Sequence, residues 1–114
     1  MKTKPNIDRL RRYEDGSDFF ELDGSVVMRL TRSAAIEVCA RAASHMRIVA
    51  RIEGGVWLDP YFEARGDCIW DGESPPVPKK VAEQNNIAAR SFILEAAEDI
   101  DVFIITAPRL SGWA

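Results

Sequence analysis

Six carboxylates gather in one short segment and are the first candidates for chemistry. Residues 53–76 contain only one basic residue, Arg65, beside Glu53, Asp59, Glu63, Asp67, Asp71 and Glu73. Paired carboxylates can act as general acid and base, and clusters of them can bind a cation. The spacing of these six matches no calcium-binding loop. We therefore expect either a solvated acidic surface or a surface that attracts a basic partner.

The other side chains capable of catalysis stand alone. His45 is the single histidine, and Cys39 and Cys68 are the two cysteines. This set matches no metal-ligand spacing, and no nucleophile with a neighbouring base can be identified. We expect His45 to end a helix and the cysteines to pack in the core. The sequence argues against an enzyme and predicts neither a metal site nor a cofactor.

Two of the three tryptophans, Trp57 and Trp70, accompany the acidic segment. If Val56 and Leu58 face the core, the alternation of a strand points Trp57 toward solvent. An outward tryptophan beside carboxylates is typical of a protein-binding hot spot. The alternative is that both tryptophans pack beneath the proline-rich segment that follows.

Length and composition indicate a single globular domain of 114 residues with a net charge of −3. No apolar run is long enough to span a bilayer, and the charged N-terminus does not resemble a signal peptide. We therefore expect a cytoplasmic protein without a membrane partner. The acidic segment would repel phosphate, so we expect no direct binding of nucleic acid.

Hydrophobic periodicity predicts an α+β fold, with a small, mostly antiparallel sheet and two helices packed against it. Thr31 is the predicted N-cap of the first helix, and Phe62 and Phe103 are predicted core residues. The predicted helices are residues 30–46 and 81–99, and the predicted strands are 46–53, 56–59, 61–70 and 101–108. The last strand is almost continuously apolar, so we expect it at the centre of the sheet.

Glycine and asparagine residues predict the irregular positions. Gly54-Gly55 predicts a turn, and Asp23-Gly24 predicts a hairpin within residues 19–28. Gly66 predicts a bulge in the strand that contains it. Asn85-Asn86 is unfavourable inside a helix, so the second helix could begin as late as Asn86.

Four motifs, LTRSAAIEVC, IEGGVWLDPYF, NNIAARSF and VFIIT, resemble the family of immunity proteins against the tRNA-cleaving colicin E-five. The likeness covers residues 28–106, about two-thirds of the chain. It implies an immunity domain over residues 28–114 and leaves residues 1–27 as an N-terminal extension. Val56 departs from the family pattern. Because cognate pairs diverge most at their contacts, the partner can be a related toxin, such as the toxic tip of a contact-dependent inhibition protein.

The resemblance implies a mechanism in which the protein binds the toxin's tRNase domain one to one. Carboxylates and aromatic rings would occupy the RNA-binding cleft in place of the anticodon loop. Glu53, Trp57 and Asp59 lie at matching motif positions. Further toxin contacts are predicted from local charge alone and fall on Asp67, Trp70, Asp71 and Glu73.

Two other function classes remain open at this point. A small nucleic-acid-binding regulator would use the basic side chains of Arg9, Arg11, Arg12, Arg41, Arg47 and Arg51. A small hydrolase would use the acidic cluster, but no triad spacing supports it.

Overall fold

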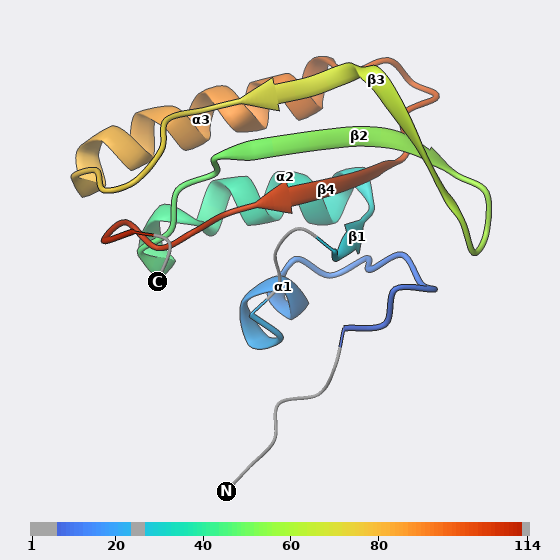
Figure 1. Ribbon diagram of the computed structural model, residues 1–114, viewed down its shortest axis with the longest axis horizontal. Helices are drawn as coiled ribbons and strands as arrows, with labels where there is room; N and C mark the ends of the chain where they lie inside the picture. The colour runs from blue at the N-terminus through green and yellow to red at the C-terminus, as the bar shows by residue number, and fades with distance from the viewer. Residues whose placement is uncertain (1–6, 24–26, 113–114) are drawn as a thin grey trace, which may run out of the picture.

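The computed structural model describes residues 7–23 and 27–112 and has a four-stranded antiparallel sheet with helices packed on it (Figure 1). The strand order is β1-β4-β2-β3. This architecture confirms the predicted α+β fold. In chain order the elements are α1 (Ser17–Glu21), β1 (Arg29–Leu30), α2 (Arg32–Arg41), the 3-10 helix η1 (Ala43–His45), β2 (Arg51–Trp57), β3 (Phe62–Asp71), α3 (Lys79–Glu95) and β4 (Val102–Thr106).

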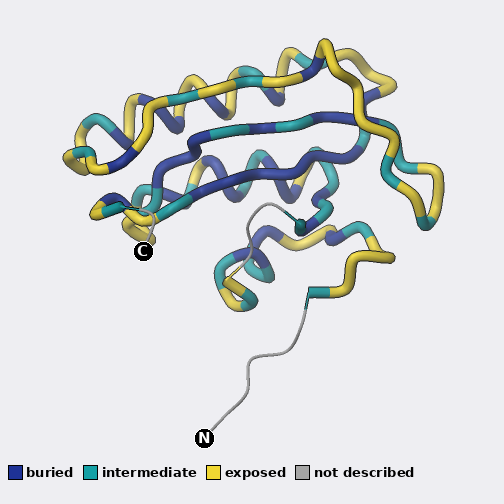
Figure 2. Tube along the Cα trace, in the orientation of Figure 1, coloured by how far each residue is buried: buried dark blue, intermediate teal, exposed yellow. Residues whose placement is uncertain are grey.

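The two long helices, α2 and α3, lie side by side on one face of the sheet (Figure 1). Their buried residues join Ile52 of β2 and Phe103 and Ile105 of β4 in one hydrophobic core. The central position predicted for the last strand is confirmed, because β4 lies between β1 and β2 and all its residues are buried (Figure 2). The two long helices and one face of the sheet therefore enclose most of the apolar surface, whereas the opposite face carries Arg51, Glu53 and Asp71 beside the apolar side chains of Ile69, Val102 and Ile104.

Asn85 and Asn86 lie inside α3, so the suggestion that this helix begins as late as Asn86 is wrong. Both amides are buried and bond to backbone groups just before β2. Asn86 Oδ1 accepts the Val49 N–H at 2.9 Å, and Asn85 Nδ2 donates to the Val49 carbonyl at 2.8 Å. Asn86 Nδ2 also donates to the Arg47 carbonyl at 3.2 Å, and Asn85 Oδ1 accepts the Glu73 N–H at 2.8 Å. These bonds offset the low helix propensity of asparagine.

Strand β2 runs straight through Gly54 and Gly55, so the turn predicted there is wrong. These glycines serve close packing instead. A Cβ on Gly54 would lie 2.5 Å from the Cys68 sulfur, well inside van der Waals contact. The chain turns only after Trp57, and the predicted strands 46–53 and 56–59 correspond to the single strand β2.

A short helix, α1, replaces the hairpin predicted around Asp23-Gly24, of which Gly24 lies outside the described residues. Phe19 on α1 and Tyr13 before it are buried in the same core as the sheet. Tyr13 also bonds to β1, donating its N–H to the Arg29 carbonyl at 2.7 Å. The described residues of the N-terminal extension therefore pack in the same hydrophobic core as the sheet.

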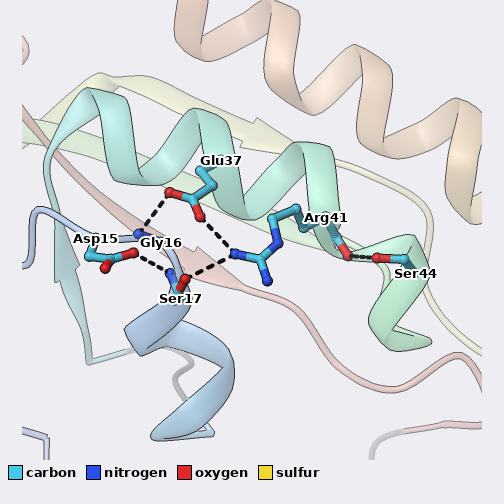
Figure 3. A network of polar contacts seen from close by, with 6 residues as sticks. All are labelled: Asp15, Gly16, Ser17, Glu37, Arg41 and Ser44. Atoms are coloured by element: carbon cyan, nitrogen blue, oxygen red, sulfur yellow. Dashed lines mark hydrogen bonds and ion pairs between the residues drawn. The ribbon is translucent and has the colours of Figure 1, made fainter.

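Helix α1 is held against α2 by a polar network (Figure 3). Glu37 accepts the Gly16 N–H at 3.1 Å and forms a 2.7 Å ion pair with Arg41. The Arg41 guanidinium also donates to the Ser17 hydroxyl at 3.1 Å. One glutamate and one arginine, a helical turn apart, thus fix the start of α1.

The first residues of α2 include its predicted N-cap, which is confirmed, and an arginine that bonds to the end of α3. Thr31 Oγ1 accepts the Ala34 N–H at 3.1 Å. The next residue, Arg32, donates at 2.6–3.0 Å to four carbonyls in and beyond the last turn of α3, those of Ile93, Ala96, Ala97 and Ile100. Because a guanidinium satisfies carbonyls that a longer helix would have used, α3 ends at Glu95 rather than near residue 99.

Replacing Asn86 by alanine should leave the Val49 N–H and the Arg47 carbonyl without their side-chain partner in the core. We expect the free energy of unfolding to fall by about 2 kcal/mol, measured by urea denaturation. Ile87→Ala, at the neighbouring exposed position, should change it by less than about 0.5 kcal/mol. Equal losses for the two variants would contradict the role assigned to the amide.

Candidate protein-binding surface

Glu53 and Asp71 lie on the sheet face opposite α2 and α3. Glu53 pairs across the sheet with Ile69, whereas its neighbour Ile52 points into the core. Arg51 shares this open face, and its guanidinium lies 2.7 Å from the Asp71 carboxylate and 3.9 Å from that of Glu53. Exposed ion pairs of this kind contribute little to stability, so both carboxylates can exchange Arg51 for a basic partner.

Trp57 ends β2 on the same open face, paired with Phe62 of β3. The Phe62 ring lies against Gly55, where an added Cβ would be 2.4 Å from a ring carbon. Both aromatic residues are half-buried. The prediction that Phe62 belongs to the core is therefore wrong, because its ring covers a glycine on the open face. Leu58 is exposed rather than buried, since β2 has already ended.

The backbone at Trp57 is held by Asp101, the residue before β4. Asp101 Oδ1 accepts the Trp57 N–H at 2.8 Å, and the Asp101 N–H donates to the Gly55 carbonyl at 3.1 Å. Arg12, in the N-terminal extension, donates to the Asp101 carbonyl at 3.0 Å, and its guanidinium lies 3.3 Å from the Asp101 carboxylate. The end of the hairpin is thus fixed by residues that are distant in sequence.

Asp59 and Asp67 extend the acidic surface along the hairpin. Asp59 lies in the turn between β2 and β3, and Asp67 lies in β3. The register between β2 and β3 shifts between Glu53, which pairs with Ile69, and Gly55, which pairs with Ala64. The irregularity therefore lies in the stretch of β3 that contains Gly66, where a bulge was predicted. Within the described residues, Asp59 and Asp67 are exposed and form no ion pair. Their full charge therefore faces solvent.

Trp70 faces the helix side of the sheet, away from Glu53 and Trp57. It pairs with Ile52 and packs against the core. Trp70, Asp71, Glu73 and Asn85 are among the residues that line a hollow of about 460 Å³ between the end of β3 and α3. Of the two roles considered for the tryptophans, packing therefore describes Trp70, and the open face brings together Glu53, Trp57 and Asp71 without it.

The remaining reactive side chains show no catalytic arrangement. Burial raises the pKa of Cys39 to about 12, and desolvation also raises the pKa of Cys68, so both thiols are protonated at neutral pH. His45 ends η1 as predicted, with its ring stacked on Phe20 at 3.8 Å. In residues 7–23 and 27–112, no cluster of histidine, cysteine and acidic residues is suited to a metal ion, and no helix is long and apolar enough to cross a bilayer.

Sequence reasoning missed two exposed residues of this surface, Leu58 and Tyr61, which flank the turn. Leu58 follows Val56 by two residues, so strand alternation would place both side chains on one face. Asp59-Pro60 was the available signal, since a turn at these residues leaves both neighbours at the end of the hairpin.

The protein is thus a small α+β domain with carboxylates and aromatic rings on an open sheet face. The chain belongs to the colicin-E5 immunity protein family, because residues 28–107 match the family described as Colicin-E5 Imm protein. It is 58% identical over 108 residues to the immunity protein CdiI of Burkholderia pseudomallei, covering 95% of this chain and 99% of the relative. It is also 35% identical over 80 residues to the colicin-E5 immunity protein of Escherichia coli, covering 69% and 96%. The resemblance drawn from the four motifs is confirmed.

An added Cβ on Gly55 would approach the Glu63 carbonyl oxygen to 2.3 Å and the Phe62 ring to 2.4 Å. Gly55→Ala should therefore displace the ring and the neighbouring β3 backbone and lower the free energy of unfolding by about 1–3 kcal/mol, as measured by chemical denaturation. Gly66→Ala is the matched control, because an added Cβ there meets no atom within 4 Å. We expect the control to stay within about 0.5 kcal/mol of the parent. A Gly55→Ala variant as stable as the parent would show that the ring is not held against this glycine.

Proposed function

We propose that this immunity protein acts in the cytoplasm, binds the tRNA-cleaving nuclease domain of a bacterial toxin one to one, and blocks its RNA-binding cleft. The protein then acts as an inhibitor and not as an enzyme. Membership of the colicin-E5 immunity family supports the partner class, and the relatives are named as immunity proteins. The toxin is a colicin nuclease or the toxic tip of a contact-dependent inhibition protein.

The observation that carries this proposal is the joint presence of Glu53, Trp57 and Asp71 on one open sheet face, continued by Asp59 and Asp67 along the hairpin. A cleft that binds an RNA loop offers cations for phosphates and flat surfaces for bases. Carboxylates satisfy the first requirement and aromatic rings the second. The contacts predicted for Trp70 and Glu73 remain predictions, and a toxin would have to reach around the β3 edge to make them.

A nucleic-acid-binding regulator is the alternative, and the ion pairs disfavour it. Most of the arginines that it would use are already engaged by carboxylates of this chain: Arg12 by Asp101, Arg41 by Glu37, Arg47 by Asp23 and Arg51 by Asp71 and Glu53. Nucleic-acid phosphates would have to compete with these carboxylates. The cost is small for the exposed pairs of Arg51 and larger for Arg12 and Arg47, whose guanidiniums are less exposed.

Trp57→Ala should weaken binding to the nuclease domain by more than about 2 kcal/mol and abolish protection in a co-expression growth assay. Binding is measured by calorimetry with the toxin domain encoded beside this chain's gene. Trp57→Phe, which keeps a ring, should retain most of the affinity. If Trp57→Ala unfolds the protein and a folded variant with an aliphatic side chain at this position still protects, the ring serves packing rather than inhibition.

Asp59→Lys should lower the association rate more than it raises the dissociation rate, because exposed carboxylates steer a basic partner over long range. Stopped-flow measurements at two ionic strengths should show the difference shrinking at high salt. Glu83→Lys on α3 changes the net charge equally but lies outside the proposed surface. Equal slowing by both variants would show that only net charge matters, and would count against this surface.

A further inference from the structure

We propose that Arg29, at the β1 edge of the open sheet face, receives a carboxylate of the toxin's nuclease domain and so helps to select the cognate toxin. This inference rests on the proposed function and adds one cationic contact to a surface that is otherwise acidic. Arg29 is not among the toxin contacts predicted from the sequence. It is identified from its place in the sheet and from its missing partner.

Arg29 lies in the same row of the sheet as Glu53. It pairs with Ile104 of β4, and Ile104 pairs on its other side with Glu53 of β2. The neighbouring residue Leu30 is buried in the core, so strand alternation places the Arg29 side chain on the open face. Two strand spacings of about 4.8 Å separate Arg29 from Glu53, so their backbones are about 10 Å apart. A protein that covers Glu53 would therefore also reach Arg29.

The Arg29 guanidinium has no partner within residues 7–23 and 27–112. Its Nε is buried without a hydrogen bond, and its terminal nitrogens form neither a hydrogen bond nor an ion pair there. Other arginines do contact carboxylates of the chain, namely Arg12, Arg41, Arg47, Arg51 and Arg65. A buried N–H without an acceptor costs free energy, and an acceptor supplied by a bound protein would recover it.

The residues beside Arg29 leave this edge with unbalanced positive charge. The bridge between Tyr13 and Leu30 is parallel, so it places Arg12 level with Arg29 along the edge of the sheet. The Asp101 carboxylate lies 3.3 Å from the Arg12 guanidinium, and its other oxygen accepts a backbone N–H. Asp101 is thus engaged by Arg12, and Arg29 stays unpaired.

Charge decides which group fits Arg29. A backbone carbonyl would accept one hydrogen bond, whereas a carboxylate also neutralises the guanidinium and offers two oxygens to its planar fork. A lysine or arginine of another toxin at the same place would be repelled, because like charges brought together in an interface cost free energy. Arg29 therefore favours toxins that carry an aspartate or glutamate opposite β1 and disfavours those with a basic residue there.

The test replaces Arg29 by methionine, which keeps an unbranched chain beside Ile104 and removes the guanidinium. Calorimetry with the nuclease domain encoded beside this chain's gene measures affinity, and urea denaturation measures the stability of the free protein. We expect Arg29→Met to weaken binding at least about tenfold. The denaturation midpoint should stay at or above that of the parent, because the folded protein loses no hydrogen bond.

Two further variants separate this contact from net charge. Arg29→Lys keeps the charge but not the fork, so its affinity should lie between those of the parent and Arg29→Met. Arg90→Met makes the same charge change at an exposed position of α3, on the helix layer, and should bind within about twofold of the parent. Equal weakening by Arg29→Met and Arg90→Met would overturn the proposal.

A double-mutant cycle identifies the partner. Each aspartate and glutamate of the nuclease domain is changed in turn to its amide. The change at the residue that meets Arg29 should weaken binding to the parent at least about fivefold and binding to Arg29→Met less than about twofold. If no amide is coupled to position 29, if Arg29→Met binds like the parent, or if it lowers the denaturation midpoint, the proposal fails and the proposed function stands. If the parent does not bind the nuclease, the proposed function itself fails.

Discussion

Two adjacent amides inside α3 hold the helix layer to the sheet. Asn85 and Asn86 satisfy backbone groups of Arg47 and Val49, just before β2, and of Glu73, just after β3. At these points the chain has left the strand ladder but is still near the core, where an unpaired backbone group costs more than asparagine loses in helix propensity. The pair therefore sets where the two strands begin and end relative to α3, and the hairpin between them depends on that position.

Both long helices cover the same face of the sheet. One face therefore packs in the hydrophobic core, and the other is open to solvent. Core residues alternate along β2 and β3 with residues of the open face, so Ile52 and Trp70 stabilise the strands on which Glu53 and Asp71 are displayed. The bulge near Gly66 interrupts the outer edge of β3 and exposes Asp67. An interrupted edge is also a poor template for pairing with another strand, which favours recognition by side chains over strand addition.

The sequence predicted those features that depend on local chemistry. The Thr31 cap follows from a hydroxyl that bonds to its own helix, the bulge from a glycine that has no side chain, and the central strand from a continuous apolar run. It failed where tertiary contacts override local preference. Gly54-Gly55 has the composition of a turn but is required by the Cys68 sulfur and the Phe62 ring, and Asn85-Asn86 is tolerated in a helix because of bonds to a segment 36–39 residues away. The candidate protein-binding surface was predicted only in part. Strand register, which the sequence does not show, decides whether Trp57 or Trp70 lies on the open face.

The contact from Arg12 to Asp101 links the N-terminal extension to the end of the β2–β3 hairpin, although Arg12 precedes residues 28–107, which match the family. A substitution in the N-terminal extension can thus tilt the hairpin without altering any side chain of the proposed binding surface. Substitutions in the N-terminal extension would then give an immunity protein a second way to adapt to a changing toxin, because they alter the orientation of the hairpin while the residues of the binding surface stay the same.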